Sequence, residues 1–307
     1  MKINSILKFN LFFFLIMSFS LNAQKSASSI SHSFFIAGPK FTGIIGESGE
    51  VIWDSKKSGA RDGYVLKNGN ILICWADEVR EYNKEKRVIL NYKKHQESIE
   101  FGTAVRLSNG HTMIAESGIK PRIVEINKKG DVVKSIPLQP ETDNIHMQTR
   151  MARKLENGNY LVPHLLAFAV KEYKSDGTIV NVFRTDYEKF GGKKSRTWPF
   201  TAIRLKNGNT LVTLTNGNRV VEFNAEGKII WEIDNSLFKK NPLVDPCGAQ
   251  RLPNGNTVIA SYGSQNGIKI FEIDLYKKIV WTYDNYRAHH FQILTTNGEK
   301  IKGRPLK

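Results

Sequence analysis

Short runs of alternating apolar and polar residues fill this chain, and tight turns join them. The clearest unit lies at residues 204–212, where Asn207-Gly208 separates Arg204-Leu205-Lys206 from Asn209-Thr210-Leu211-Val212. Asn-Gly between two such runs is the strongest short signal for a β-hairpin, because both central residues of a type I′ turn need positive φ. We therefore expect two antiparallel strands that meet at this turn.

The same hairpin recurs along the whole chain. Its turn glycines lie 41 to 50 residues apart, at Gly69, Gly110, Gly158, Gly208, Gly255 and Gly298. A second turn follows in the repeats, as at residues 224–228, so each repeat holds four strands. A repeat of about 40–50 residues built only from strands is typical of a β-propeller. The predicted fold is all-β, a six-bladed propeller with four strands in each blade.

The two chain ends complement each other. Residues 34–54 read as three strands without an Asn-Gly turn, whereas His290–Thr295 reads as a single strand that precedes one. We predict that both ends combine to form the last blade, because closing the ring removes exposed sheet edges.

The N-terminus has the pattern of an export signal. Lys2 and Lys8 flank the start of an apolar run from Leu11 to Phe19, and Leu21-Asn22-Ala23 suits a cleavage site. We expect residues 1–23 to be a signal peptide, 24–32 a flexible segment and 33–307 a single propeller domain. A membrane anchor is the alternative, but the run is short for a span. The expected location is therefore the periplasm or the exterior, without stable membrane insertion.

The chain is strongly basic, with 45 Lys and Arg against 29 Asp and Glu and a formal net charge of +16. This balance favours an acidic partner. The basic residues are spread over all the repeats, no aromatic-basic RNA motif is present, and export argues against nucleic acid. We expect an anionic oligosaccharide as the ligand of a monomer. A basic surface that is simply solvated is the alternative.

Cys74 and Cys247 are the two cysteines of the chain. An oxidising compartment makes a disulfide worth considering. The repeat register, however, places the two residues in well-separated repeats, so we expect two unpaired and mostly buried thiols. A nucleophilic Cys247 would also lack a local family signature.

Two repeated phrases carry a family resemblance. Residues 227–231 (GKIIW) and 49–53 (GEVIW) resemble the G-K-x-x-W repeats of quinoprotein-like propellers, and the NGNTL phrases resemble arylsulfotransferase-like propellers. The chain also resembles short exported propellers among polysaccharide-degradation proteins of Bacteroidota. These likenesses imply the fold and not an activity. The quinone of the first group needs eight blades and a regular Trp pattern, so we expect no cofactor.

Candidate site residues are those that break the repeat where loops converge on one mouth of the propeller. Most residues six before each turn glycine are small, which suits crowded inner strands. Residues eight before it vary and are often basic: Arg61, Gly102, Arg150, Phe200, Cys247 and His290. Six after the glycine, at the end of the second strand, stand Trp75, Glu116, His164, Leu214 and Ser261. The aliphatic Leu214 predicts that the fourth blade adds no chemistry at this level.

The leading hypothesis is a lyase or dehydratase that acts on acidic, uronic-acid oligosaccharides by β-elimination, with or without sulfation. Such an enzyme needs a cation for the substrate carboxylate, a base for the α-proton and an acid for the leaving oxygen. Arg61, Arg150 and Arg196 are the candidate cations. Candidate bases are His146 and His164, and candidate acids are Tyr262 and His290. Candidate sugar contacts are Trp75, Trp198 and Glu116.

Three alternatives stay open at this stage. A non-catalytic propeller that binds glycans or proteins would need no acid or base. An arylsulfotransferase-like transferase would use a histidine nucleophile. Three histidines at one mouth could also hold a divalent ion, although no tight ligand spacing such as H-E-x-x-H is present, and we expect no metal.

Overall fold

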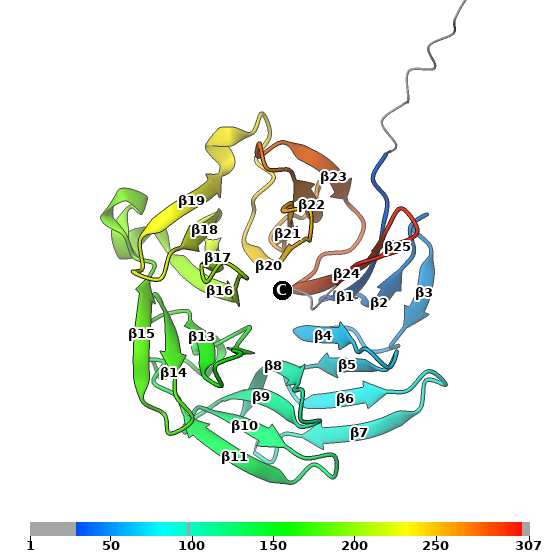
Figure 1. Ribbon diagram of the computed structural model, residues 1–307, viewed down its shortest axis with the longest axis vertical. Coiled ribbons are helices and arrows are strands. Elements are labelled where there is room, and N and C mark those ends of the chain that lie inside the picture. The colour runs from blue at the N-terminus through cyan, green and yellow to red at the C-terminus, as the bar shows by residue number, and fades with distance from the viewer. Residues whose placement is uncertain (1–28, 97–98, 303–307) are drawn as a thin grey trace, which may run out of the picture.

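The computed structural model describes residues 29–96 and 99–302. Six sheets surround a central axis, and each runs from an inner strand outward to an edge strand (Figure 1). The predicted six-bladed, all-β propeller is confirmed. The predicted signal peptide, residues 1–23, lies outside the described residues, as does the first part of segment 24–32.

Five blades each take four consecutive strands. The first contains β4 (Asp62–Val65), β5 (Ile71–Cys74), β6 (Glu78–Tyr82) and β7 (Val88–Lys93). The second contains β8 (Glu100–Arg106), β9 (Thr112–Ser117), β10 (Arg122–Ile126) and β11 (Val132–Pro137). The third contains β12 (Arg153–Lys154), β13 (Tyr160–His164), β14 (Ala169–Tyr173) and β15 (Ile179–Arg184). The fourth contains β16 (Thr197–Arg204), β17 (Thr210–Asn216), β18 (Arg219–Phe223) and β19 (Ile229–Asp234). The fifth contains β20 (Pro246–Arg251), β21 (Thr257–Ser261), β22 (Ile270–Ile273) and β23 (Ile279–Tyr283).

Both ends of the chain build the sixth blade, as predicted. Its strands are β1 (His32–Ala37), β2 (Thr42–Ile45), β3 (Val51–Asp54), β24 (His290–Thr296) and β25 (Glu299–Lys300). Strand β24 pairs antiparallel with β1, and Phe35 lies opposite Gln292. The blade has five strands instead of four, because the chain turns at residues 297–298 and adds the two-residue β25.

The hairpin turns differ from the type I′ turn that the Asn-Gly pairs suggested. In the first five copies φ is positive, between 85° and 88°, at the glycine, whereas the preceding asparagine is not in this region. That asparagine instead accepts a hydrogen bond through Oδ1, as in Asn207 from the main-chain N–H of Asn209 at 3.1 Å. Only the last copy has positive φ at both residues, 50° at Asn297 and 82° at Gly298. The asparagine therefore acts mainly through its side chain.

Apolar side chains of neighbouring blades form the core between the sheets. Leu72 of β5 packs in one cluster with Ile114 of β9, for example. The inner strands are crowded, since a Cβ added at Gly63 would lie 2.5 Å from a ring carbon of Phe35. This crowding explains the small residues six before each turn glycine. Cys74 and Cys247 are both buried and unpaired, as predicted.

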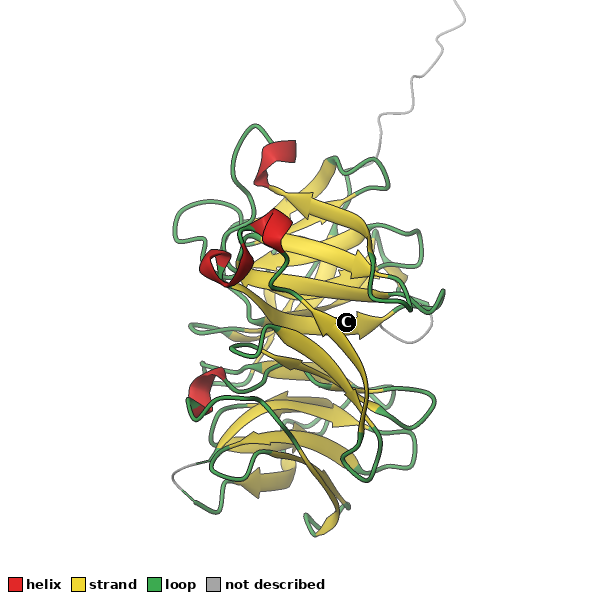
Figure 2. Cartoon of the chain, turned by 90° about the vertical axis from the view of Figure 1, so that its left-hand side faces the viewer, coloured by secondary structure: helices red, strands yellow, loops and turns green. Residues whose placement is uncertain are grey.

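Four short 3-10 helices of the described residues all lie in loops that lead from an outer strand to the next inner strand. They are η1 (Ile145–Met147), η2 (Glu188–Phe190), η3 (Gly192–Ser195) and η4 (Asn235–Leu237). Figure 2 shows the helices on one side of the disc. Within the part of the chain that the structure describes, no helix is long and apolar enough to cross a membrane.

Candidate functional site

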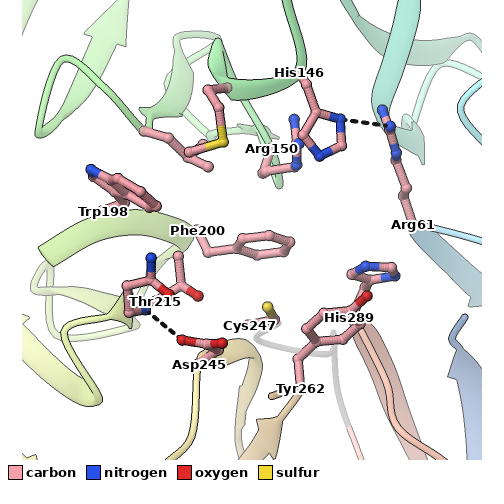
Figure 3. Close-up of a pocket in the computed structure, with 13 residues that line it drawn as sticks. Arg61, His146, Arg150, Trp198, Phe200, Thr215, Asp245, Cys247, Tyr262 and His289 are labelled. Carbon is pink, nitrogen blue, oxygen red and sulfur yellow. Dashed lines mark hydrogen bonds between the residues drawn. The ribbon is translucent and has the colours of Figure 1, made fainter. Parts of the chain in front are cut away.

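A pocket of about 200 Å³ lies among the inner strands and the loops that hold η1 (Figure 3). Five of the ten predicted site residues line it: Arg61, His146, Arg150, Trp198 and Tyr262. The other lining residues are Met147, Leu165, Phe200, Thr215, Asn216, Asp245, Cys247 and His289. Sequence positions from 61 to 289 thus converge on one cavity.

One side of the pocket carries a histidine oriented by a carboxylate. The Nδ1 atom of His146 lies 3.1 Å from Oε2 of Glu100 and 3.4 Å from an Arg61 nitrogen. Nδ1 cannot donate to the carboxylate and accept from the guanidinium at once. We assign the proton to Nδ1, because the contact with Glu100 is shorter and opposite in charge. The lone pair of His146 then lies on Nε2, and the imidazole is 62% exposed.

Glu100 stays ionised at this place. Its Oε2 also accepts a hydrogen bond from Arg61 at 2.6 Å, and Arg61 donates to the carbonyl of Phe101 at 2.9 Å. The hydrogen bond from His146 and then that from Arg61 hold the pKa of Glu100 at about 2. Glu100 therefore neutralises Arg61 while it orients His146.

Arg150 is a buried cation without a carboxylate partner. It is 4% exposed, and its NH1 donates to the carbonyl of Thr149 at 2.8 Å. Among the described residues, no Asp or Glu forms an ion pair with it. Burial, reinforced by the charge of Arg61, lowers the pKa of Arg150 to about 9. Burial makes the charged form of Arg150 unfavourable, and an anion in the pocket would offset this free-energy cost. The guanidinium is therefore suited to hold an anion.

The opposite wall places a tyrosine on a histidine. The rings of Tyr262 and His289 stack with centroids 4.2 Å apart. Nδ1 of His289 lies 3.1 Å from the carbonyl oxygen of Ala60, which can only accept, so Nδ1 carries the proton and Nε2 the lone pair. Burial lowers the pKa of His289 to about 4 and raises that of Tyr262. Near neutral pH the wall therefore offers an uncharged imidazole and a protonated phenol.

Cys247 lines the pocket but is a poor nucleophile. Burial, followed by the nearby charge of Asp245, raises the pKa of its thiol far above the usual value. The thiolate is the reactive form, so a thiol with a raised pKa is inert. In residues 29–96 and 99–302, no three His, Cys, Asp or Glu residues are grouped to hold a metal ion.

The structure places five predicted site residues outside the pocket. The expectation that His164 lies at a solvated mouth is wrong, because it is fully buried between Tyr173 Oη at 2.8 Å and the carbonyl of Gln148 at 3.3 Å. His290 is also fully buried, with Nε2 3.6 Å from an Asp62 oxygen. Neither side chain can reach a ligand in this pocket.

The other three do not line the pocket either. Trp75 is 2% exposed and donates through Nε1 to the carbonyl of Ser58, so it cannot stack on a sugar there. Glu116 is 1% exposed and accepts from Arg122 at 2.7 Å. The guanidinium of Arg196 lies 6.0 Å from the centre of the Trp198 ring, outside the pocket lining.

Several of these errors share a physical cause. Successive residues of a strand point to opposite faces, so a choice that is one residue out selects the wrong face. In the third, fourth and fifth blades the residues six after the turn glycine are buried, whereas the next ones, Leu165, Thr215 and Tyr262, line the pocket. Likewise His289 lines it and His290 does not. The expectation that the fourth blade adds no chemistry at this level is wrong for the same reason. Leu214 is buried, but the next residue, Thr215, lines the pocket.

His164 and His289, whose pKa values are lowered, predict that stability falls in mild acid. Burial lowers the pKa of His164 to about 3 and that of His289 to about 4, against about 6.5 in an unfolded chain. Above pH 6.5 both are neutral in either state and contribute nothing. Below it the unfolded chain takes up protons that the folded chain does not. These two histidines should therefore lower the free energy of unfolding as the pH drops from about 6.5 towards 4, by at most about 2.7 kcal/mol per pH unit between them.

Urea titrations at about pH 7, 6 and 5 would measure this slope. His164→Gln should make it shallower because one of the two histidines is removed. His95→Gln, at an exposed position, is the matched control and should leave the slope unchanged. An unaltered slope in His164→Gln would contradict the prediction.

Residues 17–238 match the family described as Mal s 1 allergenic protein-like. The chain belongs to this family. No curated protein matches this Mal s 1-like propeller in sequence.

Solved structures share the fold of this Mal s 1-like propeller. A protein of unknown function from Bacteroides caccae is 21% identical with a TM-score of 0.74, and the match covers 85% of this chain and 98% of that one. A catalytically inactive histidine-to-alanine variant of virginiamycin B lyase from Staphylococcus aureus, with quinupristin, is 16% identical with a TM-score of 0.55, over 75% and 71% of the two chains. A streptogramin B lyase is 13% identical with a TM-score of 0.58, over 86% of both.

Proposed function

We propose that the pocket catalyses β-elimination on a uronic-acid ring of an acidic oligosaccharide. The observation that carries this proposal is the buried Arg150, which forms no ion pair with a carboxylate of residues 29–96 or 99–302 and shares one cavity with an oriented histidine and a protonated tyrosine. These are the three groups that elimination next to a carboxylate needs. The cavity has a volume of about 200 Å³. That space suits a single sugar ring.

In the proposed reaction, Arg150 binds the substrate carboxylate and stabilises the negative charge that develops on it. His146 takes the α-proton through Nε2, since Glu100 holds its Nδ1–H. The electrons of the broken C–H bond form the C=C bond, and the C–O bond to the leaving group breaks. Tyr262, protonated at neutral pH because its pKa is raised, gives its proton to the leaving oxygen. Solvent then restores both groups.

Two further observations support a lyase. The fold is shared with the virginiamycin B and streptogramin B lyases, and the inactive Staphylococcus aureus variant lacks a histidine. The net charge of +16 favours an acidic substrate. We also propose that the protein works in the periplasm or outside the cell, as the N-terminal sequence predicts.

A spectroscopic assay tests the proposal. Incubation with uronic-acid oligosaccharides should produce the ultraviolet absorbance of a carboxylate conjugated to a new C=C bond, and mass spectrometry should find the unsaturated product. A neutral oligosaccharide of the same length is the control and should give neither signal. Saturable binding of the acidic oligosaccharide without any product would instead identify a non-catalytic binding propeller.

A further inference from the structure

The pocket has a second polar end that the proposed reaction does not use. Figure 3 shows Asp245 and Thr215 on the far side of Phe200 from Arg150 and His146. Thr215 lies near the end of β17, and Asp245 immediately precedes β20. One end of the cavity is therefore cationic, and the other presents a carboxylate.

The carboxylate of Asp245 is held firmly in place. Its Oδ1 accepts a hydrogen bond from the main-chain N–H of Asn216 at 3.1 Å, and its own N–H donates to Asn218 Oδ1 at 2.8 Å. Its φ of 47° lies in the left-handed region, which side chains other than glycine adopt rarely. Opposite it, a Cβ at Gly263 would lie 2.6 Å from Oδ2.

Asp245 also has unused capacity to accept hydrogen bonds. Among the described residues, no Lys, Arg or His forms an ion pair with it. An ionised carboxylate offers about four acceptor sites, and the main-chain N–H of Asn216 fills one of them. A ligand that brings hydrogen-bond donors to this end would fill more.

We propose that Asp245 is a specificity residue that accepts hydrogen bonds from the hydroxyl groups of the sugar ring, while Arg150 holds the carboxylate of the same ring. This inference rests on the proposed function. Hydroxyls suit the site better than an ammonium group, because the positive charge of Arg150 already lies in this cavity and a further cation would lose its hydration beside it. The aromatic ring of Phe200 lies between the two ends and that of Trp198 at the side of the pocket, where they can pack on the ring C–H groups.

Binding of three small acids tests this assignment without any turnover. Glucuronate carries a ring carboxylate and hydroxyls, cyclohexanecarboxylate carries the carboxylate alone, and 4-aminocyclohexanecarboxylate carries an ammonium group as well. Titration calorimetry would compare the unmodified protein with Asp245→Asn. Asparagine tolerates the left-handed backbone and keeps Oδ1 as an acceptor. Asp284→Asn, at an exposed position outside the pocket, is the matched control.

We expect Asp245→Asn to weaken glucuronate binding about ten- to hundredfold and to leave cyclohexanecarboxylate unchanged. Arg150→Met should weaken both, and Asp284→Asn neither. An equal loss for the two acids, or no loss for either, would overturn the assignment. If Asp245→Asn weakened the binding of 4-aminocyclohexanecarboxylate alone, the site would take an ammonium group instead, and the assignment would be wrong. Failure of the elimination assay alone would leave these binding results intact, so the two proposals can fail separately.

Discussion

Replacing Arg150 by methionine should reduce elimination roughly a hundredfold to a thousandfold, because the substrate carboxylate loses its fixed cation. The melting temperature should change little. Methionine keeps much of the buried volume, and removal of the guanidinium leaves no carboxylate unpaired, since Arg150 bonds to a main-chain carbonyl. Steady-state rates and thermal melts of the same preparations would measure both effects.

Arg196→Met is the matched control for this variant. Arg196 lies near the same mouth, against the Trp198 ring, but does not line the pocket. The Arg196→Met variant should therefore catalyse elimination at the rate of the unmodified protein. If Arg196→Met lost as much activity as Arg150→Met, the effect would come from the general positive charge of the mouth and not from a specific carboxylate site.

Replacing Tyr262 by phenylalanine should lower the turnover number about a hundredfold to ten-thousandfold and leave KM nearly unchanged. Phenylalanine keeps the ring that stacks on His289 at 4.2 Å but removes the proton donor. Tyr286→Phe is the control, because that ring stacks on Phe41 outside the pocket. Rates with both variants on uronic-acid oligosaccharides would measure the difference.

The leaving group gives this prediction a sharper test. A uronate that carries an aryloxy group at C4, the carbon β to the carboxylate, releases a phenolate that leaves without protonation. This substrate should recover most of the rate in Tyr262→Phe, since no acid is then required. A merely structural role for Tyr262 would slow both substrates equally. An equal loss on the alkyl and aryl substrates would therefore exclude Tyr262 as the general acid.

Local periodicity was enough to predict the fold. The spacing of Gly69 to Gly298, the strand pattern around each turn and the complementary chain ends predicted six blades and their closure. The separate repeats of Cys74 and Cys247 correctly predicted two free thiols. Turns and strands depend on residues that are neighbours in the sequence, and the blade count depends on the repeat spacing. Both can be read from a single sequence.

The composition of the pocket needed the tertiary structure. Sequence alone brought Arg61, Arg150 and Tyr262 to the candidate set, but it could not show which face of a strand end points to the mouth, so it chose His164 and His290 in place of Leu165 and His289. It also gave no sign that Glu100 pairs with Arg61 and His146, or that Asp245 lines the same cavity as Arg150, on the far side of Phe200. Those pairings join residues from different blades, and only the closed ring brings them within reach.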